Sequence, residues 1–94
     1  MTRRLVFRKH AAMRMLQRGI RDDDVEAALA SGEVIEEYPE DYPFASRLVL
    51  GWSGPRPLHV VASDAPDEDV TYIITTYEPD PNEWEPDLKR RKKL

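Results

Sequence analysis

The sequence predicts an α+β domain, with two N-terminal helices packed on one face of an antiparallel sheet of about four strands. Apolar residues recur at helical spacing in the first third of the chain. After Gly32 the pattern becomes strand-like, rich in β-branched and aromatic residues. Short links join the strand-like segments, which indicates an antiparallel meander. Helices followed by strands are typical of a sheet covered on one face.

The first elements are a short strand and a helix. Residues 5–7 form an apolar run that fits a first edge strand, and residues 9–18 follow with helical spacing. The residues predicted to form the buried stripe of this helix are Ala12, Met13, Leu16 and Ile20. Gly19 provides the C-terminal stop, because glycine readily adopts the left-handed conformation there.

A second helix is predicted to begin at the run Asp22-Asp23-Asp24 and to end at Ser31-Gly32. Asp22 or Asp23 can cap its N-terminus, and acidic residues favour the positive end of the helix dipole. Capping explains the acidic run better than a metal site does, because consecutive side chains point in different directions.

Four strands are expected over residues 33–38, 47–52, 57–63 and 70–77. The last of these carries apolar residues on both faces, which predicts a central position. Residues 78–87 are rich in proline and cannot lie inside a sheet, but we expect Trp84 to dock on the sheet and draw this segment back over the domain. Residues 1–94 form a single domain, with residues 1–4 and 88–94 expected to fray.

Composition excludes several classes of protein. The 94 residues are 40% hydrophobic and 34% charged, without an apolar run long enough to span a membrane. There are no cysteines, hence no disulfide framework and no thiolate metal site, and the cytoplasm is the default compartment. The net charge of −4 is unlike that of most nucleic-acid-binding domains. Residues 1–20 nevertheless hold six Lys and Arg and no acid, and residues 89–93 are all basic, so the two ends could form a local positive surface.

The two histidines are the strongest candidates for chemistry. His10 precedes Arg14 and Arg18 by four and eight residues, which places an imidazole and two guanidinium groups along one side of a helix. His59 interrupts the apolar strand that includes Leu58 and Val60. Imidazole titrates near neutral pH and guanidinium binds phosphate, so a phosphodiester-binding or phosphodiester-cleaving site is one interpretation.

Several blocks in order resemble a family of small bacterial proteins called domain of unknown function 4258. They are His10-Ala11, Arg14-Met15, Gln17-Arg18-Gly19-Ile20, Gly32-Glu33-Val34-Ile35-Glu36, Tyr38-Pro39, Arg56-Pro57-Leu58-His59-Val60-Val61, Ile74-Thr75-Thr76-Tyr77-Glu78-Pro79-Asp80 and Trp84. This family is similar to RelE-like toxins, and its members are often linked with zinc-finger antitoxins. The resemblance therefore implies a RelE-like fold, a ribonuclease toxin and an antitoxin-like partner.

On this interpretation the chain is a metal-independent ribonuclease that uses no cofactor. His10 and His59 are the candidate acid and base, and Glu36 is a reserve base. Arg14 and Arg18 would bind the phosphate of an RNA substrate. Tyr77 and Trp84 would position or stack the substrate.

Each of these residues also has a structural alternative. His10 could simply begin the first helix, and His59 could be hydrogen-bonded to a tail carboxylate such as Glu83 or Glu85. Arg14 and Arg18 could pair with acids of the second helix, and Tyr77 could belong to the core.

Two other functions fit the same sequence. One is a non-catalytic module whose basic ends grip RNA or a protein and whose sheet receives an antitoxin-like peptide. The other is a purely structural subunit with its histidines buried and far apart. Zinc binding ranks last, because two histidines without cysteine or the usual spacing fall short of a ligand set. The sequence leaves the oligomeric state open.

Overall fold

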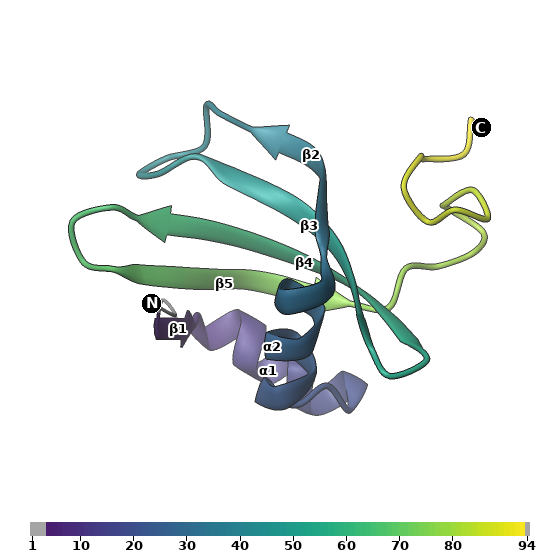
Figure 1. Ribbon diagram of the computed structural model, residues 1–94, viewed down its shortest axis with the longest axis horizontal. Coiled ribbons are helices and arrows are strands. Elements are labelled where there is room, and N and C mark those ends of the chain that lie inside the picture. The colour runs from purple at the N-terminus through teal and green to yellow at the C-terminus, as the bar shows by residue number, and fades with distance from the viewer. Residues whose placement is uncertain (1–3, 94) are drawn as a thin grey trace.

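A computed structural model describes residues 4–93 as one α+β domain (Figure 1). The elements are β1 (Arg4–Phe7), α1 (Lys9–Arg18), α2 (Asp22–Ser31), β2 (Glu33–Tyr38), β3 (Ser46–Ser53), β4 (Arg56–Ala65) and β5 (Val70–Tyr77). Both predicted helices and all four main strands are confirmed, with bounds that differ by no more than two residues. Arg4, which was expected to fray, begins β1 and pairs with Val70. The predictions for residues 1–3 and 94 lie outside the described residues.

The sheet has five strands in the order β1-β5-β4-β3-β2. Strands β2 to β5 pair antiparallel in sequence order, as predicted, and β5 lies inside the sheet. The edge strand expected over residues 5–7 is confirmed as β1. The prediction of an antiparallel sheet of about four strands was wrong, because β1 joins the other four strands and runs parallel to β5. Link lengths could not reveal this pairing, since almost the whole domain separates β1 from β5 in the sequence.

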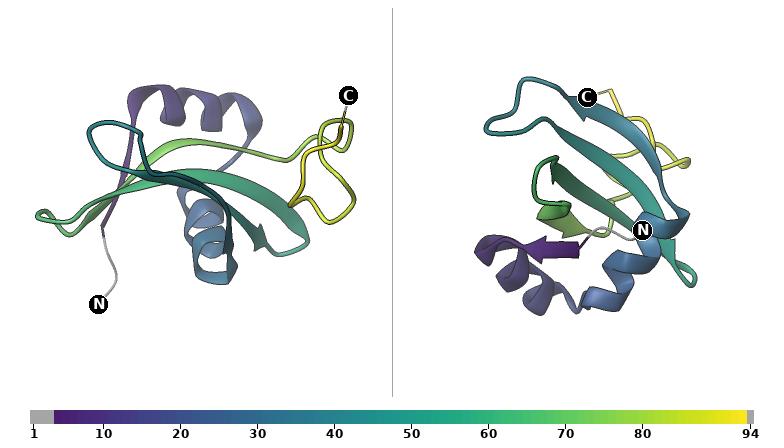
Figure 2. Two further views of the ribbon diagram at one scale, coloured as in Figure 1. Left: turned by 90° about the horizontal axis from the view of Figure 1, so that it is seen from above. Right: turned by 60° about the vertical axis from the view of Figure 1, so that its left-hand side comes forward.

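Both helices pack on one face of the sheet (Figure 2, right). This helix face is built from alternate residues of β4, because successive side chains of a strand point to opposite sides. Its buried cluster consists of Ala11, Met15, Ile20, Val25, Ala28, Leu58, Val60, Ala62 and Ile73. Gly51 of β3 permits the close approach of α2, because a Cβ there would collide with the Ala28 carbonyl.

Helix α1 is rotated relative to its predicted orientation. Ala11 and Met15 face the core, whereas Met13 is 51% and Leu16 is 85% exposed. The predicted stripe of Ala12, Met13, Leu16 and Ile20 was therefore wrong except at Ile20. Apolar residues lie on more than one side of this helix, so spacing alone did not decide which side is buried.

The C-terminal segment after β5 folds back on itself beyond the end of the sheet (Figure 1). We call residues 79–93 the strap. As predicted, Trp84 is buried, with 3% of its surface exposed. Residues 88–93 were expected to fray, and this prediction was wrong, because Lys89 and Arg91 form ion pairs with β2.

Among residues 4–93, no helix is long and apolar enough to cross a membrane.

Candidate functional site

His59 lies on the sheet face opposite the helices. It is the cross-strand neighbour of Leu50 and Tyr77. Successive side chains of a strand alternate between faces, so His59 points away from the helix face to which Leu58 and Val60 point. The strap covers this surface, which we call the strap face. The Trp84 ring stands edge-on to the imidazole at 4.4 Å between centroids, and His59 is 0% exposed.

Both ring nitrogens of His59 have partners within the chain. Nε2 lies 2.8 Å from the carbonyl oxygen of Leu88, and Nδ1 lies 3.4 Å from the Tyr77 hydroxyl. A carbonyl oxygen can only accept, so Nε2 carries the proton and Nδ1 is free to accept from Tyr77. His59 is thus a satisfied buried histidine, as one alternative proposed, although its partner is a strap carbonyl rather than Glu83 or Glu85.

Glu36 joins the same surface from β2, where it lies opposite Leu48. Its carboxylate accepts two hydrogen bonds from Arg91, at 3.1 and 3.2 Å, and one from the Tyr38 hydroxyl. The Arg91 guanidinium also stacks over the Trp84 ring, 4.7 Å from its centroid. The strap therefore supplies the cation that neutralises Glu36.

These contacts shift the acid–base properties of the strap face. Burial lowers the pKa of His59, although the Leu88 carbonyl and Glu36 oppose the shift. The hydrogen bonds from Arg91 lower the pKa of Glu36, and burial raises the pKa of Tyr77. At neutral pH the cluster therefore holds a neutral imidazole, an ion pair and a protonated phenol.

Arg18 lies beside this cluster. Its guanidinium donates to the carbonyl of Thr76 at 2.9 Å, at the end of β5 that β1 does not cover. Arg18 and Tyr77 line a hollow of about 450 Å³ together with three carboxylates. The carboxylates belong to Glu78, Asp80 and Glu83. Negative charge predominates there, which disfavours an RNA phosphate.

His10 and Arg14 lie elsewhere. Both are exposed on α1, which packs on the helix face, whereas His59 lies on the strap face. The sheet therefore separates the two histidines, and the structure does not bring them into one acid–base pair. It does bring together His59, Glu36, Tyr77 and Trp84, with Arg18 at the border.

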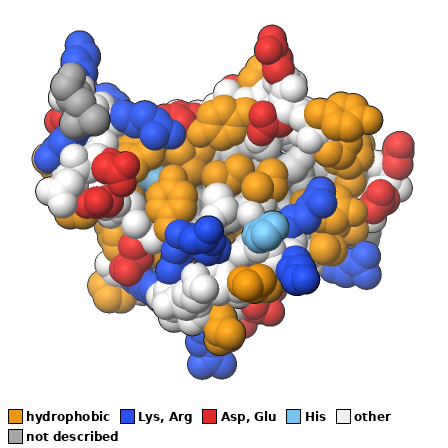
Figure 3. Space-filling view, turned by 180° about the vertical axis from the view of Figure 1, so that it is seen from behind, with side chains coloured by type: hydrophobic (Ala, Val, Ile, Leu, Met, Phe, Trp, Pro, Cys, Tyr) orange, Lys and Arg blue, Asp and Glu red, His pale blue; other side chains and the backbone are white. Residues whose placement is uncertain are grey.

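The outer face of α1 has a composition unlike that of the strap face. We define it by the exposed residues Lys9, His10, Met13, Arg14 and Leu16. Among the described residues, neither Lys9 nor Arg14 has an ion-pair partner, so Arg14 does not pair with the acids of α2 as one alternative suggested. Figure 3 views this side of the molecule and shows a histidine bordered by Lys and Arg beside hydrophobic side chains.

A groove of about 320 Å³ adjoins this face. Its lining is apolar except at one end, where Asp22 lies. The apolar residues are Phe7, Ala12, Met15, Leu16 and Ile20. Leu16 belongs both to this lining and to the outer face of α1, where Met13 is also exposed.

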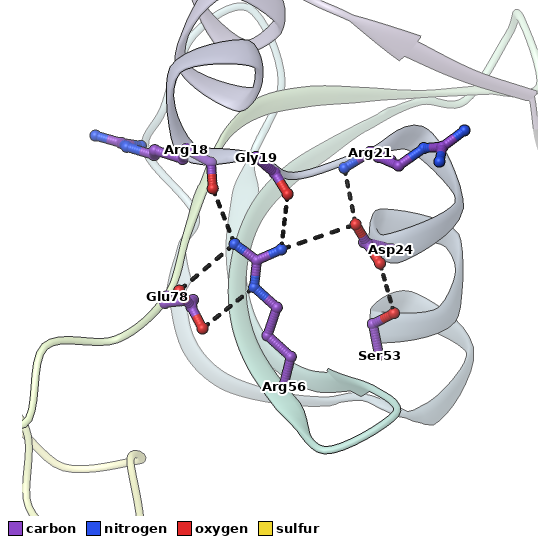
Figure 4. Close-up of polar contacts among 7 residues, drawn as sticks. All are labelled: Arg18, Gly19, Arg21, Asp24, Ser53, Arg56 and Glu78. Carbon is purple, nitrogen blue, oxygen red and sulfur yellow. Dashed lines mark hydrogen bonds and ion pairs between the residues drawn. The ribbon is translucent and has the colours of Figure 1, made fainter.

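Arg56 is an organising residue that the sequence did not single out (Figure 4). Its guanidinium donates to the carbonyls of Gly19 and Arg18 at the end of α1, at 2.8 and 2.9 Å. It also pairs with Glu78 at 3.2 Å and lies 3.9 Å from Asp24 of α2. The only sequence signal was its place in the block that precedes His59.

Asp24 in turn caps α2 by accepting from the backbone N–H of Arg21 and from the hydroxyl of Ser53 (Figure 4). Asp22 or Asp23 was expected to cap this helix, whereas the carboxylate that does so belongs to Asp24, one or two residues later. The position three residues into a helix can reach back to the cap residue, which explains the difference.

No group of three or more His, Cys, Asp or Glu in residues 4–93 could hold a metal ion.

The profile of one protein family, described as domain of unknown function (DUF4258), matches residues 7–78. Neither the curated proteins nor the solved structures contain a match. The RelE-like character of the fold therefore stays a prediction. Because the match covers more than half of the chain and includes both helices and the whole of β2 to β5, the protein belongs to the DUF4258 family.

Proposed function

We propose that the protein is a non-catalytic binding module whose outer α1 face and adjoining groove hold an acidic, amphipathic segment of another protein. The observation that carries this proposal is the exposure of Met13 and Leu16 beside Lys9 and Arg14, two cations without an ion-pair partner within residues 4–93. A helix of a small domain ordinarily turns such residues toward the core, and a contiguous apolar surface typically marks a site of association.

Charge and shape define the partner. Lys9 and Arg14 favour acidic groups, and the groove beside Leu16 favours apolar side chains. An amphipathic helix with acidic residues along one border meets both demands. RNA supplies negative charge for the cations but does not fit the apolar groove, because aliphatic side chains such as Leu16 offer it neither stacking nor charge. An antitoxin-like protein, which the family resemblance implies, is a partner of this kind.

The proposal is tested with a synthetic acidic amphipathic helix of about 20 residues, a scrambled peptide of the same composition, and single-stranded oligouridine. We expect the amphipathic peptide to bind and to shift the amide resonances of α1. Leu16→Glu should reduce affinity by more than about tenfold, the effect of one lost apolar anchor plus charge repulsion. The control is Val34→Glu, because Val34 lies on β2 and is 49% exposed. Leu29 of α2 is partly buried and is therefore not a suitable control position. Equal binding of both peptides, or binding of oligouridine alone, would overturn the proposal.

A ribonuclease is the second candidate, favoured by the cluster of His59, Glu36 and Tyr77 on one face. In the toxin-like interpretation, His59 and Glu36 would move protons and Arg18 would meet the phosphate. The strap now occupies Nε2 of His59, so this activity requires the strap to leave.

Cleavage of a short RNA at enzyme excess and low salt is the direct test of this second candidate. Activity that survives in His10→Ala but falls about 10²-fold or more in Glu36→Gln and Tyr77→Phe would support it. Intact RNA with both the wild-type protein and Arg91→Ala, whose strap loses its contact with Glu36, would exclude it.

A further inference from the structure

The strap face holds a segment of its own chain. Trp84 supplies an apolar anchor that is almost completely buried against His59. Buried aromatic side chains are frequent anchors at protein interfaces. The segment bound in this way belongs to the same chain.

Polar contacts fix the orientation of the strap. The Leu88 carbonyl receives the proton of His59 Nε2, and Arg91 forms a two-point contact with Glu36. Lys89 adds an ion pair with Glu33 at 2.7 Å. The surface thus recognises an aromatic ring, a backbone carbonyl and a guanidinium at defined positions.

Hydrogen bonds within the strap hold it together. Its backbone closes on itself through hydrogen bonds from Glu85 to Arg90 and from Lys92 to Glu83, and Trp84 bridges to Arg91. These internal bonds do not depend on which sheet the strap lies against.

Its covalent link to the sheet is short and stiff. The chain leaves β5 through Pro79 and Pro81, residues that favour an extended backbone. Leu88 adopts a left-handed backbone with φ 62°, a conformation that a non-glycine residue keeps only when its contacts enforce it. The Leu88 N–H bonds the Glu85 carbonyl within the strap, and the Leu88 carbonyl contacts His59 of the sheet.

From these contacts we infer that the strap face can receive the strap of a second copy of this chain, forming a dimer by strap exchange. A second copy is the occupant that the structure favours, because it reproduces the Trp84, Leu88 and Arg91 contacts without any new complementarity. A strap tethered to its own sheet acts at an effective concentration of about 1 mM, so the closed monomer prevails in dilute wild-type protein.

Charge reversal on two separate full-length chains tests the exchange. Glu36→Arg places two arginines in contact within one chain, and Arg91→Glu places two glutamates in contact. In an exchanged heterodimer, the strap with Glu at position 91 meets the sheet with Arg at position 36, and the wild-type pair re-forms at the other sheet. Only the mixture restores both ion pairs.

We expect each variant to be monomeric at about 0.1 mM, below the effective concentration of a tethered strap. Native mass spectrometry of an equimolar mixture should show the heterodimer in about tenfold excess over either homodimer, with one chain isotopically labelled. The double variant Glu36→Arg/Arg91→Glu is the matched control, because its strap can close on its own sheet and should leave it monomeric.

The pair Glu33→Lys and Lys89→Glu applies the design at a more exposed ion pair, where a smaller excess of heterodimer is expected, and covers a failure of either first variant to fold. No heterodimer in either mixture would overturn the inference. Equal dimer in a single variant and in the mixture would also overturn it, since association would then use another surface. The outer face of α1 is unchanged in all of these chains, so failure here leaves the proposed function intact.

Discussion

The outer face of α1 and the strap face each carry one histidine of this protein, but the polar groups are exposed on the first surface and buried with partners on the second. On the strap face His59 is 0% exposed and both its nitrogens have partners. On α1 His10 is exposed, and Arg14 beside it has no ion-pair partner among the described residues. The strap completes one surface, whereas nothing in residues 4–93 covers the other.

The buried polar side chains of the strap face stabilise the fold, whereas the exposed ones of α1 are accessible to a partner. A histidine that is buried and hydrogen-bonded contributes to folding, and an exposed one contributes little. Residue type alone suggested that the two histidines were equivalent. Their surroundings indicate that substitutions at the strap face should affect stability first, and substitutions on α1 should affect binding first.

The largest expected effect is that of His59→Ala. The change leaves a cavity beneath Trp84 and removes the hydrogen-bond partner of the Leu88 carbonyl. We expect the free energy of unfolding to fall by about 2–4 kcal/mol, measured by urea denaturation. His10→Ala is the control and should stay within about 0.5 kcal/mol of wild type. Similar losses for both variants would remove the distinction between the two surfaces.

Arg56→Ala should have the next largest effect. The variant loses the hydrogen bonds that satisfy the end of α1 and the ion pair with Glu78. A loss of about 1–3 kcal/mol is expected, because each removed contact involved a charged donor. Arg14→Ala changes the same type of side chain at a site without a partner and should be nearly neutral in the same denaturation assay. Equal stability of the two variants would show that Arg56 does not hold the elements together.

The pH dependence of stability should trace to His59. Burial lowers the folded-state pKa of His59 below its ordinary value of 6.5, so the unfolded chain binds the proton first. The free energy of unfolding should therefore be unaffected by this group above pH 6.5 and should decrease as pH falls below that value. His59→Gln should flatten the curve in this window, whereas His10→Gln should not.

Glu36 should add a separate loss at lower pH, since Arg91 depresses its pKa from 4.5. For His59 itself, a free energy of unfolding of the wild-type protein that does not change between pH 7 and pH 5 would contradict its buried, neutral state.

The smallest expected effect is that of Lys89→Ala at the border of the strap face. The ion pair with Glu33 is solvent-exposed, and exposed ion pairs contribute only about 0–1 kcal/mol. Urea denaturation should give a curve close to that of wild type, with little dependence on salt. A loss as large as that of His59→Ala would mean that ion pairs, rather than the buried Trp84, hold the strap in place.

Much of the fold could be predicted from local pattern. Alternation and β-branched residues located β2 to β5, and Gly19 ended α1 with a left-handed backbone of φ 64°. The docking of Trp84 also followed from residue type, because a large aromatic side chain in a proline-rich segment gains most by burial. Each of these depends on interactions between residues close in the sequence or on the properties of a single side chain.

The candidate site could be predicted only in part. Residue type pointed to His59, Glu36, Tyr77 and Trp84, and the structure brings these four together. Arg91 and Arg56 were not identified, because their roles depend on partners 55 residues away at Glu36 and 37 residues away at Gly19. A basic run near the C-terminus gives no local sign of which of its members meets a carboxylate.

By itself the sequence determined the element types, their order and the residues that carry chemistry, because helical and strand periods are local properties of the chain. Only the tertiary structure decided which side of α1 is buried, that β1 pairs with β5, and that the sheet lies between His10 and His59. These outcomes depend on long-range packing, and a shift of one residue in a strand or a small rotation of a helix exchanges a buried side chain for an exposed one.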